Sequence, residues 1–516
     1  MRKMRMRHCL AMAASVAVSA VVVGAGAASA ATVKPPIELV SHDVAGGYGD
    51  ADSDRASASS GMQSIAFISS ASDLDAPSNG DAQVYVRDRA SGRLELITVG
   101  TGGKPAVGDA QSVAISADGQ KVAFTSAGAD IIPGLTPAVS QAYLHDRSTG
   151  QTILLSHDAM GAPSSKPVRK VDIDDAGDTV AFDTAGELTS VTGNGVEQVY
   201  VWRSGTIQMA SVDPTGTAGG TMGTEEGLLS PDGRIVAFTS FDQLSASPAN
   251  GSRLQSYARY LDSGTTVMIS TSPDGSASAD KDALVSAVLD DGTALIATSA
   301  ANLAPGLTLD PVFAQLYHVS GAAPGSPTRT SILITHTAAS ATTASRADVG
   351  SSGISSDGTY VVFDSRAVDL TTSPKGTGDP EIYSWDPSTG VVSGESVDVS
   401  DPGRLSGRGA GDVSVAPDGS GYAFTARTDG LVRVPTPPIV LVWQVYAGFR
   451  ATTTPDPTPS PTSSGGVSGT VAQTGGAGLA ATGLDPTGLG AAAVLLIVAG
   501  LGAGLSFRRR TRHRRA

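Results

Sequence analysis

The stretch Ile115-Ser-Ala-Asp118-Gly119-Gln-Lys-Val-Ala-Phe124-Thr-Ser126 places an Asp-Gly pair between two short apolar runs. An Asp-Gly pair in this setting is the strongest short-range signal of a β-hairpin. The stretch therefore predicts two adjacent antiparallel strands joined by a tight turn.

The same phrase returns along the chain at intervals of roughly 58 residues, a period typical of repeat architectures. Its copies lie at 173–184, 229–240, 289–299, 354–365 and 415–426, and a degenerate first copy leads into Ile65-Ala66-Phe67. The second run of each copy carries an aromatic residue, namely Phe67, Phe124, Phe182, Phe238, Phe363 or Phe424, and we assign Ala297 to this position in the fifth copy.

A second phrase follows each hairpin and reads Gln83-Val-Tyr85-Val-Arg-Asp88-Arg-Ala-Ser-Gly92 in its first copy. It is echoed at 141–150, 255–264 and 381–390, with shorter echoes from Gln198 and Gln315 and the same spacing at 439–448. This phrase predicts a third strand that ends in a Ser/Thr-Gly turn. A fourth apolar run comes next, as at 151–156.

Four short strands per unit, seven units and no helical periodicity predict an all-β, seven-bladed β-propeller of four-stranded blades. A solenoid is the structural alternative. The ends of the repeat region favour the propeller, because residues 37–42 resemble a fourth strand and the last unit stops after its third strand at Phe449. We expect the N-terminal strand to complete the last blade and close the ring.

With its Ser-x-Asp-Gly turns, aromatic second strand and Tyr-containing third strand, the repeat resembles that of TolB-like and WD40-like propellers. The resemblance covers roughly residues 37–449. It implies a binding platform or an accessory domain, and no catalytic residue follows from it.

The N-terminus has the features of a secretory signal peptide over residues 1–30. Basic residues precede an apolar run from about Leu10 to Val23, and Ala28-Ser29-Ala30 forms the cleavage site. An uncleaved membrane anchor is the alternative. The only cysteine, Cys9, lies within this signal, so the mature chain cannot form a disulfide. Residues 31–450 are then an extracytoplasmic propeller.

After the propeller, residues 451–478 form a spacer rich in Pro, Thr, Ser and Gly that cannot bury a core. Residues 479–516 contain Leu479-Ala480-Ala481-Thr482-Gly483, an apolar span from about Leu489 to Phe507 and six arginines. The span is just long enough to cross a bilayer, and the arginines would hold the last residues in the cytoplasm. The tail thus predicts membrane contact through a single C-terminal hydrophobic span.

This ordered trio resembles the sorting signal of Gram-positive surface proteins, in the Leu-Ala-x-Thr-Gly form used by class E sortases. The resemblance implies recognition of Leu479, Ala480, Thr482 and Gly483 by sortase, with cleavage between Thr482 and Gly483. Peptidoglycan would then take the Thr482 acyl group. The alternative is a permanent membrane anchor, and both place the propeller on the cell surface.

The formal net charge of the whole chain is −14. The signal carries four positive charges and the part after Thr482 a net five, so the mature chain would carry −23. Such an acidic body argues against nucleic acid as a partner.

Candidate catalytic or metal sites are sparse in this sequence. The five histidines of the mature chain are dispersed and have no metal-ligand spacing, and a Gly-x-Ser-x-Gly elbow is absent from the sequence. Two acidic runs, Asp50-Ala-Asp52-Ser-Asp54 and Asp172-Ile-Asp174-Asp175-Ala-Gly177-Asp178, resemble the start of a calcium loop. Neither follows the full pattern, and solvated turn carboxylates are the simpler interpretation. The sequence predicts no cofactor.

Two function hypotheses remain. The first is a wall- or membrane-attached platform that binds a protein or glycan and is not an enzyme. The alternative is a propeller enzyme of the lyase, lactonase or glycosidase type, with a carboxylate or calcium site at the central channel.

Overall fold

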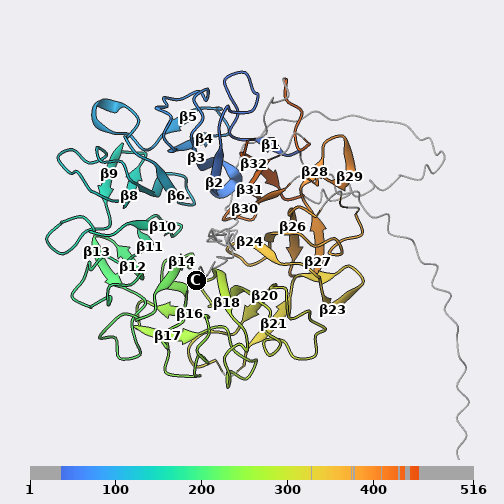
Figure 1. Cartoon of the computed structure of the whole chain (residues 1–516). Helices are drawn as coiled ribbons and strands as arrows, with labels where there is room; N and C mark the ends of the chain where they lie inside the picture. Colours follow the sequence, from blue (N-terminus) through green and yellow to red (C-terminus); the bar gives the residue numbers. More distant parts are fainter. Residues whose placement is uncertain are drawn as a thin grey trace, which may run out of the picture. The chain divides into compact units, whose positions relative to one another are not determined.

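The computed structural model describes residues 36–451 except 327, 374, 376, 377, 408, 428, 429 and 436–441. The described chain is all-β, and its helical structure is limited to the 3-10 turns η1 (Ser60–Met62) and η2 (Thr101–Gly103). The strands form seven antiparallel four-stranded sheets arranged as blades around one axis (Figure 1). The predicted seven-bladed propeller is confirmed.

The blades follow one another along the chain, each built from the axis outward. Blade 1 contains β2 (Ser53–Ala58), β3 (Ser64–Ser69), β4 (Gln83–Asp88) and β5 (Leu94–Leu96). Blade 2 contains β6 (Ala110–Ile115), β7 (Lys121–Ser126), β8 (Gln141–Asp146) and β9 (Gln151–Leu154). Blade 3 contains β10 (Val168–Ile173), β11 (Thr179–Thr184), β12 (Gln198–Arg203) and β13 (Thr206–Met209). Blade 4 contains β14 (Thr224–Leu229), β15 (Ile235–Ser240), β16 (Gln255–Tyr260) and β17 (Thr265–Met268).

The remaining blades follow the same plan. Blade 5 contains β18 (Ala283–Val288), β19 (Ala294–Thr298), β20 (Gln315–Ser320) and β21 (Thr330–Leu333). Blade 6 contains β24 (Val349–Ile354), β25 (Val361–Ser365), β26 (Glu381–Asp386) and β27 (Val391–Gly394). Blade 7 contains β30 (Ala410–Val415), β31 (Gly421–Ala426), β32 (Gln444–Phe449) and β1 (Glu38–Leu39). Two small hairpins, β22 (His336–Thr337) with β23 (Ser340–Ala344) and β28 (Val397–Asp398) with β29 (Asp401–Leu405), extend the connections on either side of blade 6.

The N-terminal strand closes the ring as the sequence predicts. Glu38 pairs with Ala447 and Leu39 with Tyr446, so β1 is the fourth strand of blade 7. Arg89 of blade 1 holds Glu38 through two contacts, Nε to Oε2 at 2.9 Å and Nη2 to Oε1 at 3.0 Å. This ion pair ties the closing strand to the neighbouring blade.

Apolar contact between blades supplies the core. In the described residues, the buried apolar side chains form seven clusters, one at each junction between successive blades. Six blades carry a Phe–Tyr ring pair across their second and third strands, as in Phe124 with Tyr143 at 5.4 Å between ring centroids. In blade 5 the partner of Tyr317 is Ile296, so our assignment of Ala297 to the aromatic position is wrong. The turn there is one residue shorter, which moves the register by one place.

A polar pair recurs in all seven blades where the fourth strand leads into the next connection. The side chain that opens the third strand accepts a hydrogen bond from a Ser or Thr hydroxyl, for example Gln198 Oε1 from Ser211 Oγ at 2.6 Å. The other pairs are Thr98 with Gln83, Ser156 with Gln141, Ser270 with Gln255, Thr335 with Gln315, Ser396 with Glu381 and Ser41 with Gln444. Each hydroxyl oxygen also accepts a hydrogen bond from a backbone N–H of the third strand, as Ser211 Oγ does from Val199 N at 3.0 Å. The pair therefore satisfies buried polar groups that would otherwise be costly.

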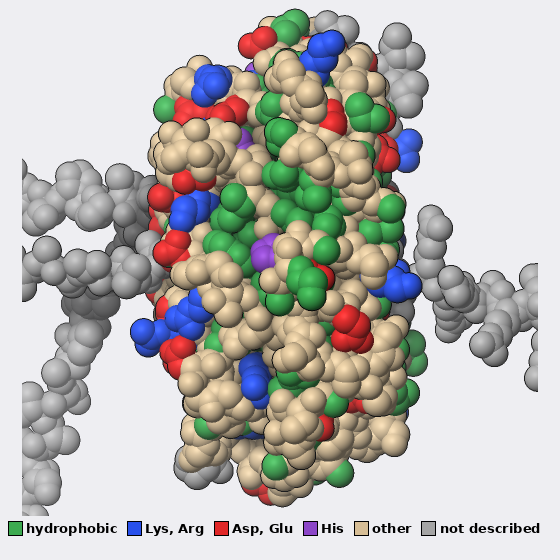
Figure 2. Space-filling view, turned by 90° about the vertical axis from the view of Figure 1, so that its left-hand side faces the viewer, with side chains coloured by type: hydrophobic (Ala, Val, Ile, Leu, Met, Phe, Trp, Pro, Cys, Tyr) green, Lys and Arg blue, Asp and Glu red, His purple; other side chains and the backbone are tan. Residues whose placement is uncertain are grey.

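The connections are unequal on the two faces of the ring. Tight turns join the first strand to the second and, except in blade 5, the third to the fourth. Longer segments join the second strand to the third and each blade to the next. Antiparallel alternation places both kinds of long segment on one face, which we call the loop face. Figure 2 shows the ring edge-on from the side of blades 2 and 3, with an irregular band of apolar side chains between scattered charged ones.

Candidate functional site

The innermost strands face the axis of the ring, and each has a register shift against its neighbour. A bulge of this kind leaves an extra residue unpaired and re-aims its side chain. On three of these bulges the extra residue is charged and has a positive φ, at Arg55 (53°), Glu226 (64°) and Asp412 (51°). A positive φ is uncommon outside glycine and marks these positions as candidate functional residues.

In blades 3 and 6, a carboxylate on the second strand accepts a hydrogen bond from the bulge of the same blade. Asp183 Oδ1 accepts the backbone N–H of Lys170 at 3.0 Å, and Asp364 Oδ1 accepts that of Ser351 at 2.6 Å. Burial raises the pKa of Asp183 and of Asp364 to about 7. Both acids therefore titrate near neutral pH.

The bulge of blade 4 borders a cleft of about 390 Å³ on the loop face. Segments of blades 3, 4 and 5 line it, and we call it the blade 4 cleft. Its chemistry comes from two groups of side chains, the apolar Met222, Phe241, Leu254 and Leu284 and the polar Glu197, Glu225, Glu226 and Thr239. Met222 is 65% exposed and Phe241 40%, so part of the apolar group is open to solvent.

Two of the three carboxylates in the blade 4 cleft form ion pairs with basic side chains of blade 3. Arg169 Nε lies 3.0 Å from Glu197 Oε1, and Lys170 Nζ contacts Glu226 Oε1. Burial raises the pKa of Glu197, Arg169 opposes this shift, and the charge of Glu225 adds to it. Glu225 itself has no ion pair in the part of the chain that the structure describes.

Thr239 is the polar group of this cleft that lacks a partner. Its side chain is 4% exposed, and its Oγ1 has no hydrogen-bond partner in the described structure. Thr239 pairs with Glu225 across β14 and β15, so both side chains lie on the same face of the sheet. The cleft thus combines an unpaired carboxylate, an unsatisfied hydroxyl and an apolar border.

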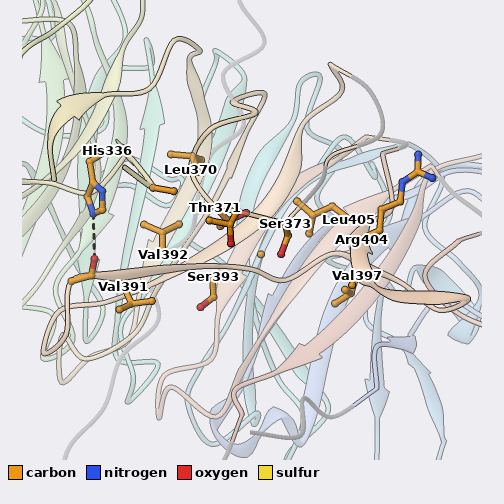
Figure 3. Close-up of a pocket in the computed structure, with 15 residues that line it drawn as sticks. His336, Leu370, Thr371, Ser373, Val391, Val392, Ser393, Val397, Arg404 and Leu405 are labelled. Atoms are coloured by element: carbon orange, nitrogen blue, oxygen red, sulfur yellow. Dashed lines mark hydrogen bonds between the residues drawn. The ribbon is translucent and has the colours of Figure 1, made fainter. Parts of the chain in front are cut away.

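A second cleft, of about 500 Å³, lies at the rim of blade 6 between β27 and the two small hairpins (Figure 3). His336 Nε2 is 3.2 Å from the carbonyl oxygen of Gly390, the contact dashed in Figure 3. The other polar groups are hydroxyls such as Ser373 and Ser393, and Arg404 extends away from the other labelled side chains. No carboxylate lines this cleft, so it offers no negative group to a cationic ligand.

A third cleft, of about 740 Å³, lies at the turns of blades 5 and 6 on the opposite face. Each of its carboxylates accepts a hydrogen bond from a backbone N–H group two residues further along the same turn. The pairs are Asp291 with Thr293, Asp357 with Thr359 and Asp386 with Ser388. These contacts are typical of turn-forming aspartates.

The first predicted acidic run is divided among three roles. Asp50 accepts hydrogen bonds from Ser72, and Asp52 accepts the backbone N–H of Trp443 at 2.8 Å. Asp54 lies on β2 at the axis, where burial raises its pKa. The structure does not bring the three carboxylates together.

The second acidic run is divided in the same way. Asp172 is buried on β10 and accepts a hydrogen bond from the backbone N–H of Leu229 at 2.7 Å. Asp174 accepts hydrogen bonds from the backbone N–H groups of Asp178 and Thr179. The side chain of Asp178 forms an ion pair with Lys121 at 2.7 Å. In the described ranges, no three His, Cys, Asp or Glu side chains are grouped as metal ligands.

The predicted sorting residues Leu479, Ala480, Thr482 and Gly483 and the hydrophobic span lie outside the described residues. Between residues 36 and 451, no described helix is long and apolar enough to cross a bilayer.

Sequence reasoning missed the residues of the blade 4 cleft. One signal was available, because Thr224-Glu225-Glu226 places two adjacent acids in an innermost strand, whereas the same two positions hold at most one acid in the other copies, Asp54 or Asp412. A similar signal is Asp183, which follows Phe182 where blades 2, 4 and 7 have threonine. The pairing of Glu225 with Thr239 could not be inferred, because it depends on the bulge.

Neither a family model nor a curated protein sequence matches the chain. Among solved structures, the β-propeller domain of the Trilobed protease from Pyrococcus furiosus is 11% identical, with 78% of this chain and 94% of that chain covered and a TM-score of 0.46. Oligogalacturonate lyase from Vibrio parahaemolyticus is 12% identical, with 78% and 91% covered and a TM-score of 0.43. TolB from Acinetobacter baumannii is 17% identical, with 49% and 53% covered and a TM-score of 0.28. The likeness to these proteins concerns the fold alone.

Proposed function

We propose that the chain is a surface-attached binding module that takes its ligand at the blade 4 cleft. The observation that carries this proposal is Glu225, which has no ion pair in the described residues and lies opposite the unpartnered Thr239 hydroxyl. Leaving a buried polar group unsatisfied costs about 1–3 kcal/mol. A ligand that supplies the missing partner would recover part of this free energy.

The border of the cleft supports ligand contact as well. Met222 and Phe241 are large, apolar and exposed on the loop face, next to the carboxylates. Concave sites that combine apolar walls with a few converging polar groups are typical of ligand sites. A protein or glycan that reaches the loop face could insert one group between them.

Surface attachment is supported by the two ends of the sequence. The signal over residues 1–30 predicts export, and the tail over 479–516 predicts recognition by sortase and transfer to peptidoglycan, or retention in the membrane. The spacer over 451–478 would separate the propeller from its anchor.

Site-specific photocrosslinking on whole cells tests the proposal. In the intact chain, Met222 is replaced by the photoreactive residue p-benzoylphenylalanine, and the cells are illuminated. We expect a defined adduct with a surface protein or glycan. The same adduct should be lost when Glu225→Gln is added, because the ligand then loses its charged contact.

Met160 provides the matched control position. It is 95% exposed and lies in the connection from blade 2 to blade 3, just as Met222 lies in the next connection, but it does not line the cleft. The photoreactive residue at position 160 should give no such adduct. Equal labelling at both positions, or adducts that survive Glu225→Gln, would contradict the proposed site.

A second candidate function is catalysis at the same cleft by Glu197 and Glu225. Both carboxyl groups line the cleft, burial raises the pKa of Glu197, and the charge of Glu225 adds to this shift. A carboxyl group with a raised pKa can act as a general acid. Incubation with cell-wall glycan fragments tests this function, since an enzyme would generate new reducing ends that Glu197→Gln abolishes.

A further inference from the structure

We infer that the blade 4 cleft recognises a protonated amino group on an unbranched apolar stem, the chemistry of a lysine side chain. The inference rests on the proposed function, because it assigns a ligand class to the same site. Four features of the cleft support it: its charge balance, its unsatisfied hydroxyl, its apolar border and the way in which it already holds a cation.

The charge balance of the cleft calls for one cation. Glu197 and Glu226 are paired with Arg169 and Lys170, whereas Glu225 has no ion pair in the described residues. Glu225 is exposed, so solvent alone compensates the third negative charge of the cleft. A single positive group would neutralise the site, and an anionic ligand would be repelled.

The Thr239 hydroxyl gives the cation a second contact. A threonine hydroxyl can accept a hydrogen bond, and an ammonium group donates three. Because Thr239 pairs with Glu225 across the two strands, one ammonium could donate to both. The Thr239 oxygen is almost fully buried in the free cleft, so a rotation of its side chain would accompany this contact.

The apolar border fits the stem that carries the charge. Met222 and Phe241 are exposed, and Leu254 and Leu284 are partly buried beside them. The methylene groups of a lysine-like stem are apolar and can bury against such residues. A cation near the face of the Phe241 ring would gain further electrostatic attraction.

The cleft already distinguishes between two of the chain's own cations. The Lys170 side chain is 35% exposed and contacts Glu226, whereas the Arg169 side chain is 62% exposed at Glu197. The compact ammonium therefore lies deeper in the cleft than the guanidinium. This difference favours an amine over a guanidinium as the ligand group.

Titration calorimetry on the intact chain in mild detergent tests the inference with Nα-acetyl-lysine methylamide as the probe. The norleucine analogue has the same stem without the charge and should not bind. The arginine analogue should bind more weakly than the lysine probe. Tighter binding of either analogue would overturn the inference.

Variants then assign the contacts. Glu225→Gln should weaken lysine-probe binding at least about tenfold, because a charge-assisted contact is lost. Thr239→Val should weaken it about threefold or more. The matched control is Thr125→Val, since Thr125 occupies the same position in blade 2, is buried and lacks a partner for its hydroxyl, but does not line the cleft. An equal loss in all three variants would contradict the assignment.

The outcomes separate the ligand class from the proposed function. If the lysine probe does not bind, but crosslinking at position 222 occurs and is lost with Glu225→Gln, the ligand class is wrong and the binding site stands. If the probe does not bind and crosslinking is absent, both proposals fail.

Discussion

The hydroxyl of Ser41 donates a 2.6 Å hydrogen bond to the side-chain oxygen of Gln444, a residue 403 positions away in the chain. The same hydroxyl accepts the backbone N–H of Val445 at 2.9 Å. In six blades this polar pair lies within one repeat, whereas in blade 7 it joins the two ends of the propeller. Ring closure therefore uses the same interaction as each blade.

We expect deletion of residues 37–43 to destabilise or aggregate the propeller. The deletion removes β1 and Ser41, exposes the edge of β32 and takes two backbone acceptors from the buried Arg87. An open sheet edge promotes association between chains. Solubility and thermal unfolding by circular dichroism would measure the effect, and cooperative melting at the wild-type temperature would disprove the closure.

Ser41→Ala is the milder version of this change. It should lower the free energy of unfolding by about 1–3 kcal/mol, because Gln444 loses its buried partner. Ser211→Ala in blade 3 removes the same contact within one repeat and serves as the control. A larger unfolding-rate increase for Ser41→Ala than for Ser211→Ala would indicate that the ring opens at blade 7.

Asp364 should make stability depend on pH. Burial raises its pKa from the ordinary 3.8 to about 7, so between these values the unfolded chain is ionised while the folded chain keeps the proton. The stability from this group is present below about pH 4 and lost as pH rises to about 7, by about 1.4 kcal/mol per pH unit.

Asp364→Asn should remove this dependence while its side-chain oxygen still accepts Ser351 N. In urea unfolding from pH 4 to pH 8, the free energy of unfolding of the variant should rise relative to that of wild type as pH rises. Asp274→Asn is the control, because hydrogen bonds from Ser272 and Ser276 lower the pKa of the exposed Asp274 to about 2. A wild-type-like pH profile for Asp364→Asn would contradict the assignment.

Blade 6 has Glu381 where the other blades have glutamine, and its surroundings differ accordingly. Glu381 accepts hydrogen bonds from Ser396 Oγ, Ser406 Oγ and Gly407 N. In blade 3, Gln198 instead donates to the carbonyl oxygens of Gly193 and Gly220 at 3.0 and 2.8 Å. At position 381 both terminal side-chain atoms must accept hydrogen bonds, whereas at position 198 one of the two must donate them.

Both Glu381→Gln and Gln198→Glu should therefore destabilise the fold, each by about 1–3 kcal/mol. The first change places an amide N–H group against hydrogen-bond donors, and the second places a carboxylate against carbonyl oxygens. Urea unfolding at pH 7 measures the change. A neutral result for Glu381→Gln would mean that the donors around Glu381 find other partners.

Thr482→Ala tests the attachment proposed from the sequence. If sortase processes the chain, the variant should remain a membrane precursor that detergent extracts, while wild type stays with the wall until a muralytic enzyme releases it. Deleting 489–516 should release the protein to the medium, because the hydrophobic span is lost. Identical fractionation of Thr482→Ala and wild type would favour an ordinary membrane anchor.

The sequence by itself determined the repeat, the strand order and the closure of the ring. Asp118-Gly119 and its relatives fix the hairpins through local turn chemistry, and residues 37–42 can be recognised as a fourth strand because they resemble the apolar runs that end other blades, such as 151–156. These signals act over a few residues, so they can be read without knowing the distant contacts.

Only the tertiary structure decided which side chains meet. The one-residue shift that puts Ile296 opposite Tyr317 and the bulge that leaves Glu225 opposite Thr239 depend on how strands are paired. The blade 4 cleft needs residues from three blades, and Ser41 reaches Gln444 only when the ring closes. The physical reason is that a side chain's direction follows from local backbone geometry, whereas its neighbours follow from the packing of segments far apart in the chain.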